Sequence, residues 1–363
     1  MKITVEKEDF INAQKAVKKI SPDSATVYLK ADEEGNTLSI ISKSVFYVNY
    51  IIPAVIEKPG VIALNKVLFE TLSNLRGKLL KMESAGNALN IVSGSKISLF
   101  CNEINSEDLV QPTVKKQNKV ILSATSVATF KSLITQCSFG SLDSYKDKTP
   151  IKIENNSSGF HVRVADYVHC AFYTYKKGIS DQEFSFITYI ENLKNVIPFL
   201  NDKSKLLIDD SLMLLKSSNI ITTLPSVQAS EAKEVESALD FINDSNYGKS
   251  KLIINRKSVL ETISSISVVS EGVDVLKLDI DEEIICSLRT SFGTSKDKIK
   301  FISNSFKNTK LELPLLMFKG ALQSCNIGDE VTFHLSKNNN FYRLFAETDS
   351  LLCQCVAPVG TVR

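Results

Sequence analysis

Hydrophobic and polar positions follow the same order three times along the chain. Each copy begins with a short run of alternating apolar and polar residues, which is typical of a half-buried strand. After a polar turn, apolar residues at relative positions 0, 3, 7 and 10 form one stripe of an α-helix. Each copy therefore predicts a strand followed by an amphipathic helix. The copies are residues 1–21, 118–138 and 250–270.

A second strand–helix pattern lies in the later half of each third of the chain, at residues 61–75, 185–200 and 313–325. Two or three short strand-like runs follow each of these copies. The chain therefore contains six similar units, each with a strand, a helix and several antiparallel strands. Three copies in register, each opening one third of the chain, argue against a chance likeness of ordinary strand–helix pairs.

These repeats predict an α+β fold with three tandem domains, each made of two strand–helix–strands units. Residues 227–249 are acidic and partly helical in pattern, so we expect them to link the second domain to the third. The predicted domains are residues 1–117, 118–226 and 250–363.

Six similar units favour a closed assembly. A helix with one apolar stripe must bury it against a sheet, so the sheets lie on one side and the helices on the other. An open row of units would leave sheet edges exposed at both ends, which favours aggregation. Two chains joined head to tail would close a ring without free edges, and a two-fold dimer is the commonest symmetric assembly. We therefore expect a homodimeric ring whose helices line the hole.

Basic side chains on the helix surfaces that face away from the sheets would line this hole. There they would oppose the phosphates of double-stranded DNA without reading its bases, and binding would weaken with salt. An ordinary solvated helix face is the alternative for each of them, and acidic residues on the same helices weaken the pattern. The residues are Lys15, Lys18, Lys19, Lys66, Arg76, Lys78, Lys131, Lys194, Arg256, Lys257 and Lys319.

Composition restricts the function further. The 363 residues include 43 Lys and Arg against 41 Asp and Glu, so any DNA contact must come from local arrangement and not from a uniformly basic surface. No run of about 18 apolar residues predicts a membrane span. The charged, alternating opening residues lack the apolar stretch of a secretory signal. Seven scattered cysteines are typical of reduced core thiols, so we expect a cytoplasmic protein without a membrane partner.

The motifs of catalysis and cofactor binding are missing from the sequence. It has neither a GxxxxGK[ST] nor a GxGxxG phosphate loop. Cys353 and Cys355 lie on one face of a predicted strand but lack a second ligand pair, so we expect no metal site. A cysteine hydrolase that uses Cys137 or Cys170 with His161 stays open as an alternative, although nothing in the sequence activates such a pair. We expect no catalytic residues and no cofactor.

The chain resembles the bacterial replicative sliding clamp, the beta subunit of DNA polymerase III, over nearly its whole length. The likeness lies in the length, the threefold repeat and three segments: the opening MKITVEKEDF, the stretch VRVADYVHCA at residues 162–171, and CVAPV at residues 355–359. It implies three clamp domains per chain and a ring of two chains around double-stranded DNA. It also implies a non-catalytic processivity factor that a clamp loader places on DNA and that tethers the replicative DNA polymerase.

The resemblance also implies a groove between the second and third domains that binds clamp-binding-motif peptides of partner proteins. Tyr167 and His169 stand where the family has Gly and Arg, which changes the shape and charge of this groove and leaves its preferred peptide open. For each of these positions, the alternative to a role in peptide binding is that of an ordinary core residue of a strand. Divergence this broad would suit a clamp carried by a phage or plasmid. The implied groove residues are Ala165, Asp166, Tyr167, Val168, His169, Cys170, Cys355, Val356, Ala357, Pro358 and Val359.

Two further sets of residues follow from the resemblance. Tyr145, Lys146 and Lys148 lie in the loop that touches emerging DNA in the family, where they would contact phosphates or stack on bases. The joint between subunits would pair edge strands of the first and third domains. It would place Ile97 and Leu99 opposite Val268 and Val269. A clamp-like scaffold that recruits partners without being loaded on DNA is the main alternative to a sliding clamp.

Overall fold

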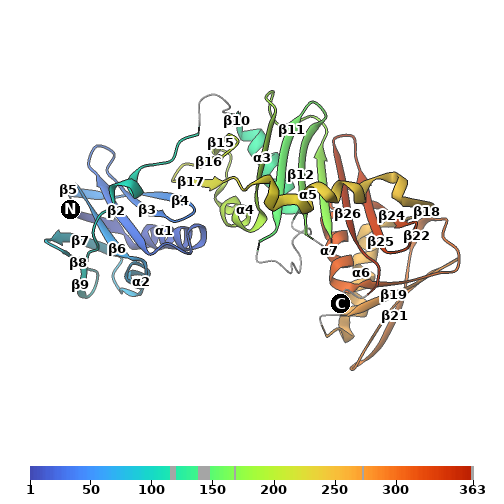
Figure 1. The fold of residues 1–363 in the computed structure, drawn as a ribbon. Helices are drawn as coiled ribbons and strands as arrows, with labels where there is room; N and C mark the ends of the chain where they lie inside the picture. Colours follow the sequence, from blue (N-terminus) through green and yellow to red (C-terminus); the bar gives the residue numbers. More distant parts are fainter. Residues whose placement is uncertain (115–119, 138–147, 167–168, 272–273, 361–363) are drawn as a thin grey trace. The chain divides into compact units, whose positions relative to one another are not determined.

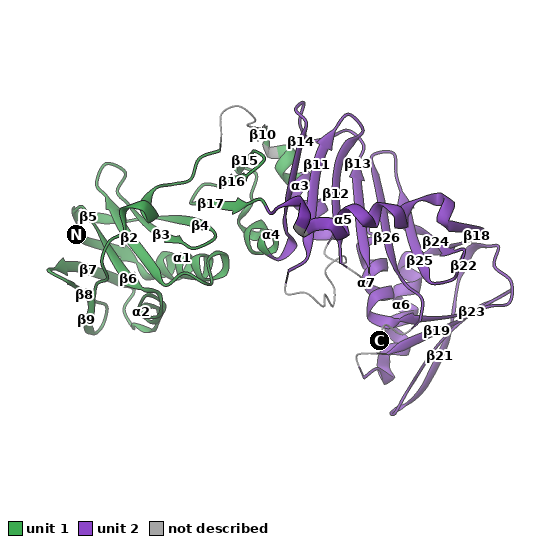
Figure 2. Cartoon of the chain, viewed as in Figure 1, with its two compact units in different colours: residues 1–128, 192–226 green, residues 129–191, 227–363 purple. Residues whose placement is uncertain are grey.

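A computed structural model describes residues 1–114, 120–137, 148–166, 169–271 and 274–360 (Figure 1). The chain divides into two compact units (Figure 2). Unit 1 contains residues 1–128 and 192–226, and unit 2 contains residues 129–191 and 227–363. This division runs through the predicted second domain, so the three domain boundaries remain a prediction.

Unit 1 contains two antiparallel sheets. The five-stranded sheet has the order β5 (Val55–Lys58), β1 (Lys2–Glu6), β7 (Leu79–Ala85), β8 (Ala88–Val92) and β9 (Lys96–Phe100). The eight-stranded sheet has the order β10 (Val120–Leu122), β15 (Lys205–Ile208), β16 (Leu212–Lys216), β17 (Ile220–Pro225), β4 (Tyr47–Pro53), β3 (Thr37–Lys43), β2 (Thr26–Asp32) and β6 (Gly60–Asn65).

Helix α1 (Lys7–Ile20) contacts β1 of the first sheet and β3 and β4 of the second. Its predicted apolar stripe is buried, and Phe10 packs edge-on against Phe69 with ring centroids 5.3 Å apart. Phe69 lies on α2 (Lys66–Thr71), which continues as the 3₁₀ turn η1 (Leu72–Asn74). A further 3₁₀ turn, η2, spans Ser106–Leu109. The stripe of α1 therefore forms core with both sheets.

Unit 2 also contains two antiparallel sheets. The nine-stranded sheet has the order β14 (Phe184–Tyr189), β11 (Pro150–Asn156), β12 (Gly159–Ala165), β13 (Cys170–Tyr175), β26 (Leu351–Pro358), β25 (Phe341–Glu347), β24 (Glu330–Ser336), β18 (Tyr247–Asn255) and β22 (Phe301–Asn304). The four-stranded sheet has the order β21 (Gly293–Ile299), β20 (Ile284–Thr290), β19 (Val275–Ile280) and β23 (Thr309–Pro314).

Helices α6 (Arg256–Ile266) and α7 (Leu315–Ser324) pack on one face of the nine-stranded sheet, where Phe318 of α7 meets Tyr342 of β25 at 5.7 Å between ring centroids. The predicted linker crosses the other face (Figure 1). The linker contains α5 (Lys233–Ser237) and the 3₁₀ turns η6 (Ala229–Ala232), η7 (Ala238–Ile242) and η8 (Asp244–Asn246). The 3₁₀ turn η9 (Ser267–Val269) follows α6.

Helices α3 (Ala124–Gln136) and α4 (Ile190–Val196) cross the division between the units, and the 3₁₀ turn η5 (Ile197–Phe199) follows α4. All six predicted strand–helix pairs and the short strands after them are present, so the predicted α+β repeat is confirmed. None of the helices in the described ranges is long and apolar enough to span a membrane.

Each large sheet joins strands from two different thirds of the chain. In unit 1, β4 pairs with β17, which places Tyr50 opposite Ile220. In unit 2, β13 pairs with β26, which places Cys170 opposite Val356. These pairings cover strand edges that would otherwise be open between consecutive thirds.

Candidate nucleic-acid interface and peptide-binding surface

The basic face of α1 is the clearest of the predicted DNA contacts. Lys15, Lys18 and Lys19 are exposed, while the opposite stripe is buried. Lys18 is partly neutralised, because its Nζ lies 3.1 Å from a carboxylate oxygen of Glu70. Lys18 and Lys19 also occupy the last turn of α1, where positive charge stabilises the helix dipole. These lysines can therefore stabilise α1 and still contact DNA.

Other predicted DNA contacts in unit 1 differ in how freely their charge faces solvent. Arg76 and Lys78 are exposed. Lys66 instead donates from Nζ to the backbone carbonyl oxygens of Ser21 and Pro22, which ties the start of α2 to the end of α1. Lys66 therefore has a structural partner within the fold.

The predicted DNA contacts in the last third are also partly engaged. Lys257 Nζ lies 2.9 Å from Asp329 Oδ1, and Arg256 donates from Nη2 to Asn326 Oδ1 at 2.6 Å. Lys319 is half-buried on α7. Each role in DNA binding remains a prediction.

Five further predicted contacts belong to the middle third, and the structure describes three of them. Lys131 is half-buried on α3, and Lys194 is exposed on α4. Lys148 Nζ lies 5.5 Å from the centre of the Tyr189 ring, a distance at which a cation is attracted to the ring face. Tyr145 and Lys146 lie outside the described residues.

The predicted peptide groove is largely covered on its outer face by the linker. Ala165, Cys170 and Val356 form one apolar cluster with Val235 and Ala238 of the linker. Cys355 and Ala357 alternate with Val356 along β26, and both are fully buried. Pro358 and Val359 remain partly exposed. A peptide would therefore meet the end of β26 and the linker more readily than the centre of this cluster.

The loop that begins the predicted groove is held by Asp166 and His169. The His169 backbone N–H donates to Asp166 Oδ1 at 2.8 Å, and the His169 ring Nδ1 lies 3.0 Å from the same oxygen. Both side chains are buried, so they shape the loop from inside. Tyr167 and Val168 lie outside the described residues.

A hollow of about 290 Å³ lies beside the linker, close to the apolar cluster. Phe341 of β25 forms one wall, and Phe241 of the linker packs against it with ring centroids 5.1 Å apart. A neighbouring hollow of about 270 Å³ includes Tyr247 and Arg343. The sequence prediction missed both phenylalanines. Two features of the sequence could have indicated them. Phe241 is an aromatic residue in an acidic linker, and Phe341 is the first residue of a predicted strand.

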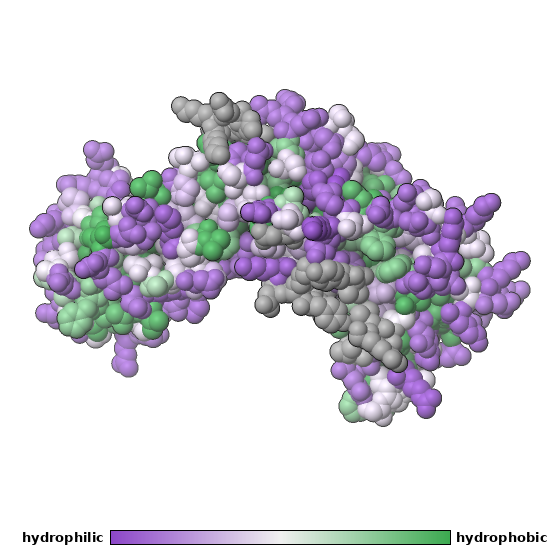
Figure 3. Space-filling view, in the orientation of Figure 1, coloured by the Kyte–Doolittle hydropathy of each residue, from purple (hydrophilic) through white to green (hydrophobic). Residues whose placement is uncertain are grey.

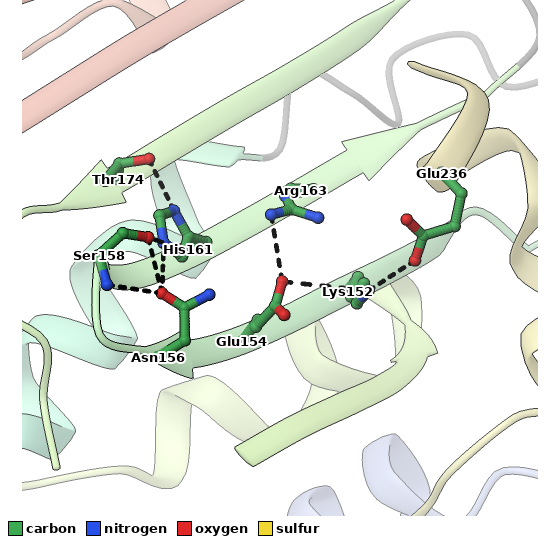
Figure 4. A network of polar contacts seen from close by, with 8 residues as sticks. All are labelled: Lys152, Glu154, Asn156, Ser158, His161, Arg163, Thr174 and Glu236. Atoms are coloured by element: carbon green, nitrogen blue, oxygen red, sulfur yellow. Dashed lines mark hydrogen bonds and ion pairs between the residues drawn. The ribbon is translucent and has the colours of Figure 1, made fainter. Parts of the chain in front are cut away.

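Ion pairs fasten the linker to the outer face of the nine-stranded sheet (Figure 4). Lys152 on β11 lies 2.6 Å from Glu236 of α5 and 4.0 Å from Glu154. Arg163 on β12 continues this network, with Nη2 3.1 Å from Glu154. The side chain of Lys152 is 15% exposed and that of Glu236 is 46% exposed, so water screens the Lys152–Glu236 pair from the linker side.

The geometry does not assemble a Cys–His nucleophile. His161 faces the outer side of β12, where its ring contacts Ser158 and Thr174. Cys137 contacts the carbonyl oxygen of Val162, which follows His161 on β12. Because side chains alternate along a strand, the Val162 and His161 side chains point to opposite faces of the sheet. Cys170 lies on β13 four residues from Thr174, the partner of His161, or roughly 13 Å at about 3.3 Å per residue.

The ionisation of these groups also opposes thiolate chemistry. Burial raises the pKa of the Cys137 and Cys170 thiols far above the ordinary value. Burial lowers the pKa of His161, and the charge of Arg163 adds to this effect. A neutral thiol is a poor nucleophile, so the hydrolase alternative has no support in the described residues.

Each unit has an open sheet edge with exposed apolar residues at the predicted subunit joint. In unit 1, β9 is an edge strand on which Ile97 and Leu99 are half-buried and Phe100 is 83% exposed. In unit 2, β21 is an edge strand, and Val268 of the nearby turn η9 is 84% exposed beside the partly buried Val269.

The sequence prediction missed two aromatic residues at these edges, Phe100 and Phe292, of which the second is 78% exposed. The visible face of each unit is otherwise mostly hydrophilic, with apolar areas scattered over it (Figure 3). Exposed aromatic residues beside an unpaired strand are typical of an interaction surface.

Comparison with known proteins identifies the fold. No protein-family model and no curated protein matches the sequence. The structure is similar to a DNA polymerase sliding clamp from Bacillus subtilis, with a TM-score of 0.81, 18% identity and full coverage of both chains.

Two further structures are similarly close. The DNA polymerase III beta chain from Streptococcus pneumoniae has a TM-score of 0.80 and 15% identity, covering 99% of this chain and 100% of that one. The DNA polymerase III subunit beta from Bartonella birtlesii, bound to griselimycin, has a TM-score of 0.79 and 15% identity over the full length of both chains. The chain therefore has the sliding-clamp fold, as the resemblance predicted.

Proposed function

We propose that this protein is a DNA sliding clamp, a non-catalytic processivity factor of the cytoplasm. Two copies would close head to tail into a ring around duplex DNA and tether the replicative polymerase. The observation that carries this proposal is the likeness of the fold to DNA polymerase sliding clamps along the entire chain. The edge strands β9 and β21 support it, because exposed apolar residues lie on or beside both and a second copy would cover them.

The contact with DNA would be made mainly by charge. Lys15 and Lys19 on α1, with Arg76 and Lys78, are exposed and would face phosphates without reading bases. The net charge of +2 gives little non-specific attraction, so the ring would hold DNA by enclosing it and would remain free to slide.

Partner proteins would bind through a short peptide at the end of β26. Pro358 and Val359 are accessible there, and the hollow beside Phe341 and Phe241 can accept an apolar side chain. The polymerase and the clamp loader are the partners that a clamp requires. Since the linker covers the centre of the predicted groove, we expect peptides to contact the linker as well as the tail.

A topological assay tests the proposed function. The protein is loaded on nicked circular DNA by a clamp loader, and the DNA is then linearised with a restriction enzyme. A ring should remain on the circle and slide off the linear form, whereas a protein that binds the DNA surface should be retained equally on both.

The same assay tests the alternative scaffold. Blocking both ends of the linear DNA with bulky protein caps should restore retention of a ring, which provides the matched control. Absence of retention on circles when the loader is active would contradict the clamp and favour a partner-recruiting scaffold.

A further inference from the structure

Three cysteine thiols from distant parts of the sequence meet inside unit 2. Cys353 Sγ lies 3.5 Å from Cys325 Sγ and 4.0 Å from Cys355 Sγ. All three sulfur atoms lie within 4.8 Å of one another, and all three side chains are fully buried. The sequence prediction considered only the Cys353–Cys355 pair and missed Cys325.

Local structure explains why the thiols converge. Alternation along β26 places Cys353 and Cys355 on the same face, the one that α7 covers. Helix α7 ends directly above them, with Cys325 as its C-cap residue. The Tyr173 hydroxyl donates to the carbonyl oxygen of Ser324, which fixes the end of the helix against the sheet.

The spacing of the sulfur atoms suits a shared metal ion better than a disulfide. A zinc–thiolate bond is about 2.3 Å long, so two sulfurs that bind one ion in a tetrahedral site lie about 3.8 Å apart. The separations of 3.5 and 4.0 Å bracket this value. A disulfide would bring two sulfurs to about 2.05 Å and leave the third thiol unused.

A buried hydroxyl group lies on the same side of the sheet as the three thiols. The Tyr342 hydroxyl is buried and has no hydrogen-bond partner among the described residues. Tyr342 lies on β25, the neighbour of β26, and its ring packs against Phe318 of α7, so it lies on the same covered face as the thiols. It is a suitable hydrogen-bond donor to a thiolate or a fourth oxygen ligand.

A positive charge lies near the same cluster. Arg256 Nη2 donates to Oδ1 of Asn326, the residue directly after Cys325, at 2.6 Å. Arg256 Nε is buried and has no hydrogen-bond partner among the described residues. Three thiolates around a divalent ion carry one net negative charge, which Arg256 would balance.

We propose that Cys325, Cys353 and Cys355 bind one thiophilic d¹⁰ metal ion, Zn²⁺ or Cu⁺, which fastens the end of α7 to β26. Thiolates select these ions over Mg²⁺ and Ca²⁺. Binding replaces the thiol protons, which pass to solvent, so the apparent affinity rises with pH. The site is structural, because full burial leaves the ion no contact with solvent.

Metal analysis of the full chain tests this proposal. The protein is treated with a chelator under anaerobic, phosphine-reduced conditions, and Zn²⁺ or Cu⁺ is then added and the excess removed. We expect one ion retained per chain and a higher melting temperature. Cys353→Ser should weaken retention by about 100-fold or more, since loss of an outer-shell partner alone costs roughly 10–100-fold. Cys286→Ser, at a buried thiol outside the cluster, should retain the ion.

A second measurement on the unmodified chain covers the case in which Cys353→Ser does not fold. Cd²⁺ should produce a thiolate-to-metal absorption band that saturates at one ion per chain. The proposal is overturned if the native chain retains neither Zn²⁺ nor Cu⁺ and Cd²⁺ gives no such band. Equal loss of metal in Cys286→Ser, or a native Cys325–Cys353 disulfide without metal, would overturn it as well.

Discussion

Arg343 illustrates how one residue can hold the linker side of the nine-stranded sheet together. Its guanidinium lies 4.3 Å from the centre of the Tyr247 ring and donates to the carbonyl oxygen of Ile242 at 3.0 Å and to Gln354 Oε1 at 3.3 Å. It also pairs with Asp244 at 2.7 Å. The arginine is 4% exposed, so its contacts with the Tyr247 ring, Ile242 and Gln354 are shielded from water.

Replacing this arginine should cost more stability than replacing its ionic partner. Arg343→Met removes the cation–π contact and leaves two acceptors unpaired, so we expect a loss of about 2 kcal/mol in the free energy of unfolding. Asp244→Asn should cost less than about 1 kcal/mol, because this carboxylate is 90% exposed. Urea denaturation followed by circular dichroism measures both. If both variants lost the same free energy of unfolding, the contacts of Arg343 with Tyr247, Ile242 and Gln354 would contribute nothing to stability.

At the scale of elements, local patterns were sufficient for most strands and helices. The stripe Phe10, Ala13, Val17 and Ile20 is buried as predicted, because helical spacing alone decides which face meets a sheet. Pairings between thirds, such as β17 with β4, were not predictable, since alternation within a strand does not reveal its neighbour.

The binding surfaces were harder to predict than the elements. Lys66 has the charge of a phosphate contact, but its partners are backbone carbonyls that no sequence pattern shows. Cys325 meets the thiols of β26 only because α7 ends above that strand. The linker covers Ala165 and Val356 through two small apolar residues among acidic ones, a signal too weak to reveal the contact.

The edge strand β9 carries the prediction for assembly. Leu99→Lys would place a charge on the open edge at the proposed joint, and lysine on an edge strand opposes pairing with another chain. We expect this variant to dissociate into single chains at concentrations where the unchanged protein is paired. Val110→Lys is the matched control, because Val110 is exposed but lies outside the sheet edge. Light scattering reports the mass, and an unchanged mass for Leu99→Lys would place the joint elsewhere.

For the whole molecule, the repeated units determine the expected assembly. Each chain contains six strand–helix units, and two of its edge strands, β9 and β21, have exposed apolar residues on or beside them. Two chains would supply twelve units, which is the number that the proposed two-fold ring requires. One chain would leave its sheet edges open, and three chains would form a ring with more than twelve units.

Electron microscopy of the purified full chain tests this ring most directly. We expect two-fold particles with twice the mass of the 40.2 kDa chain and a central opening that admits a double helix. Particles without a central opening, or single open chains at every concentration examined, would contradict it.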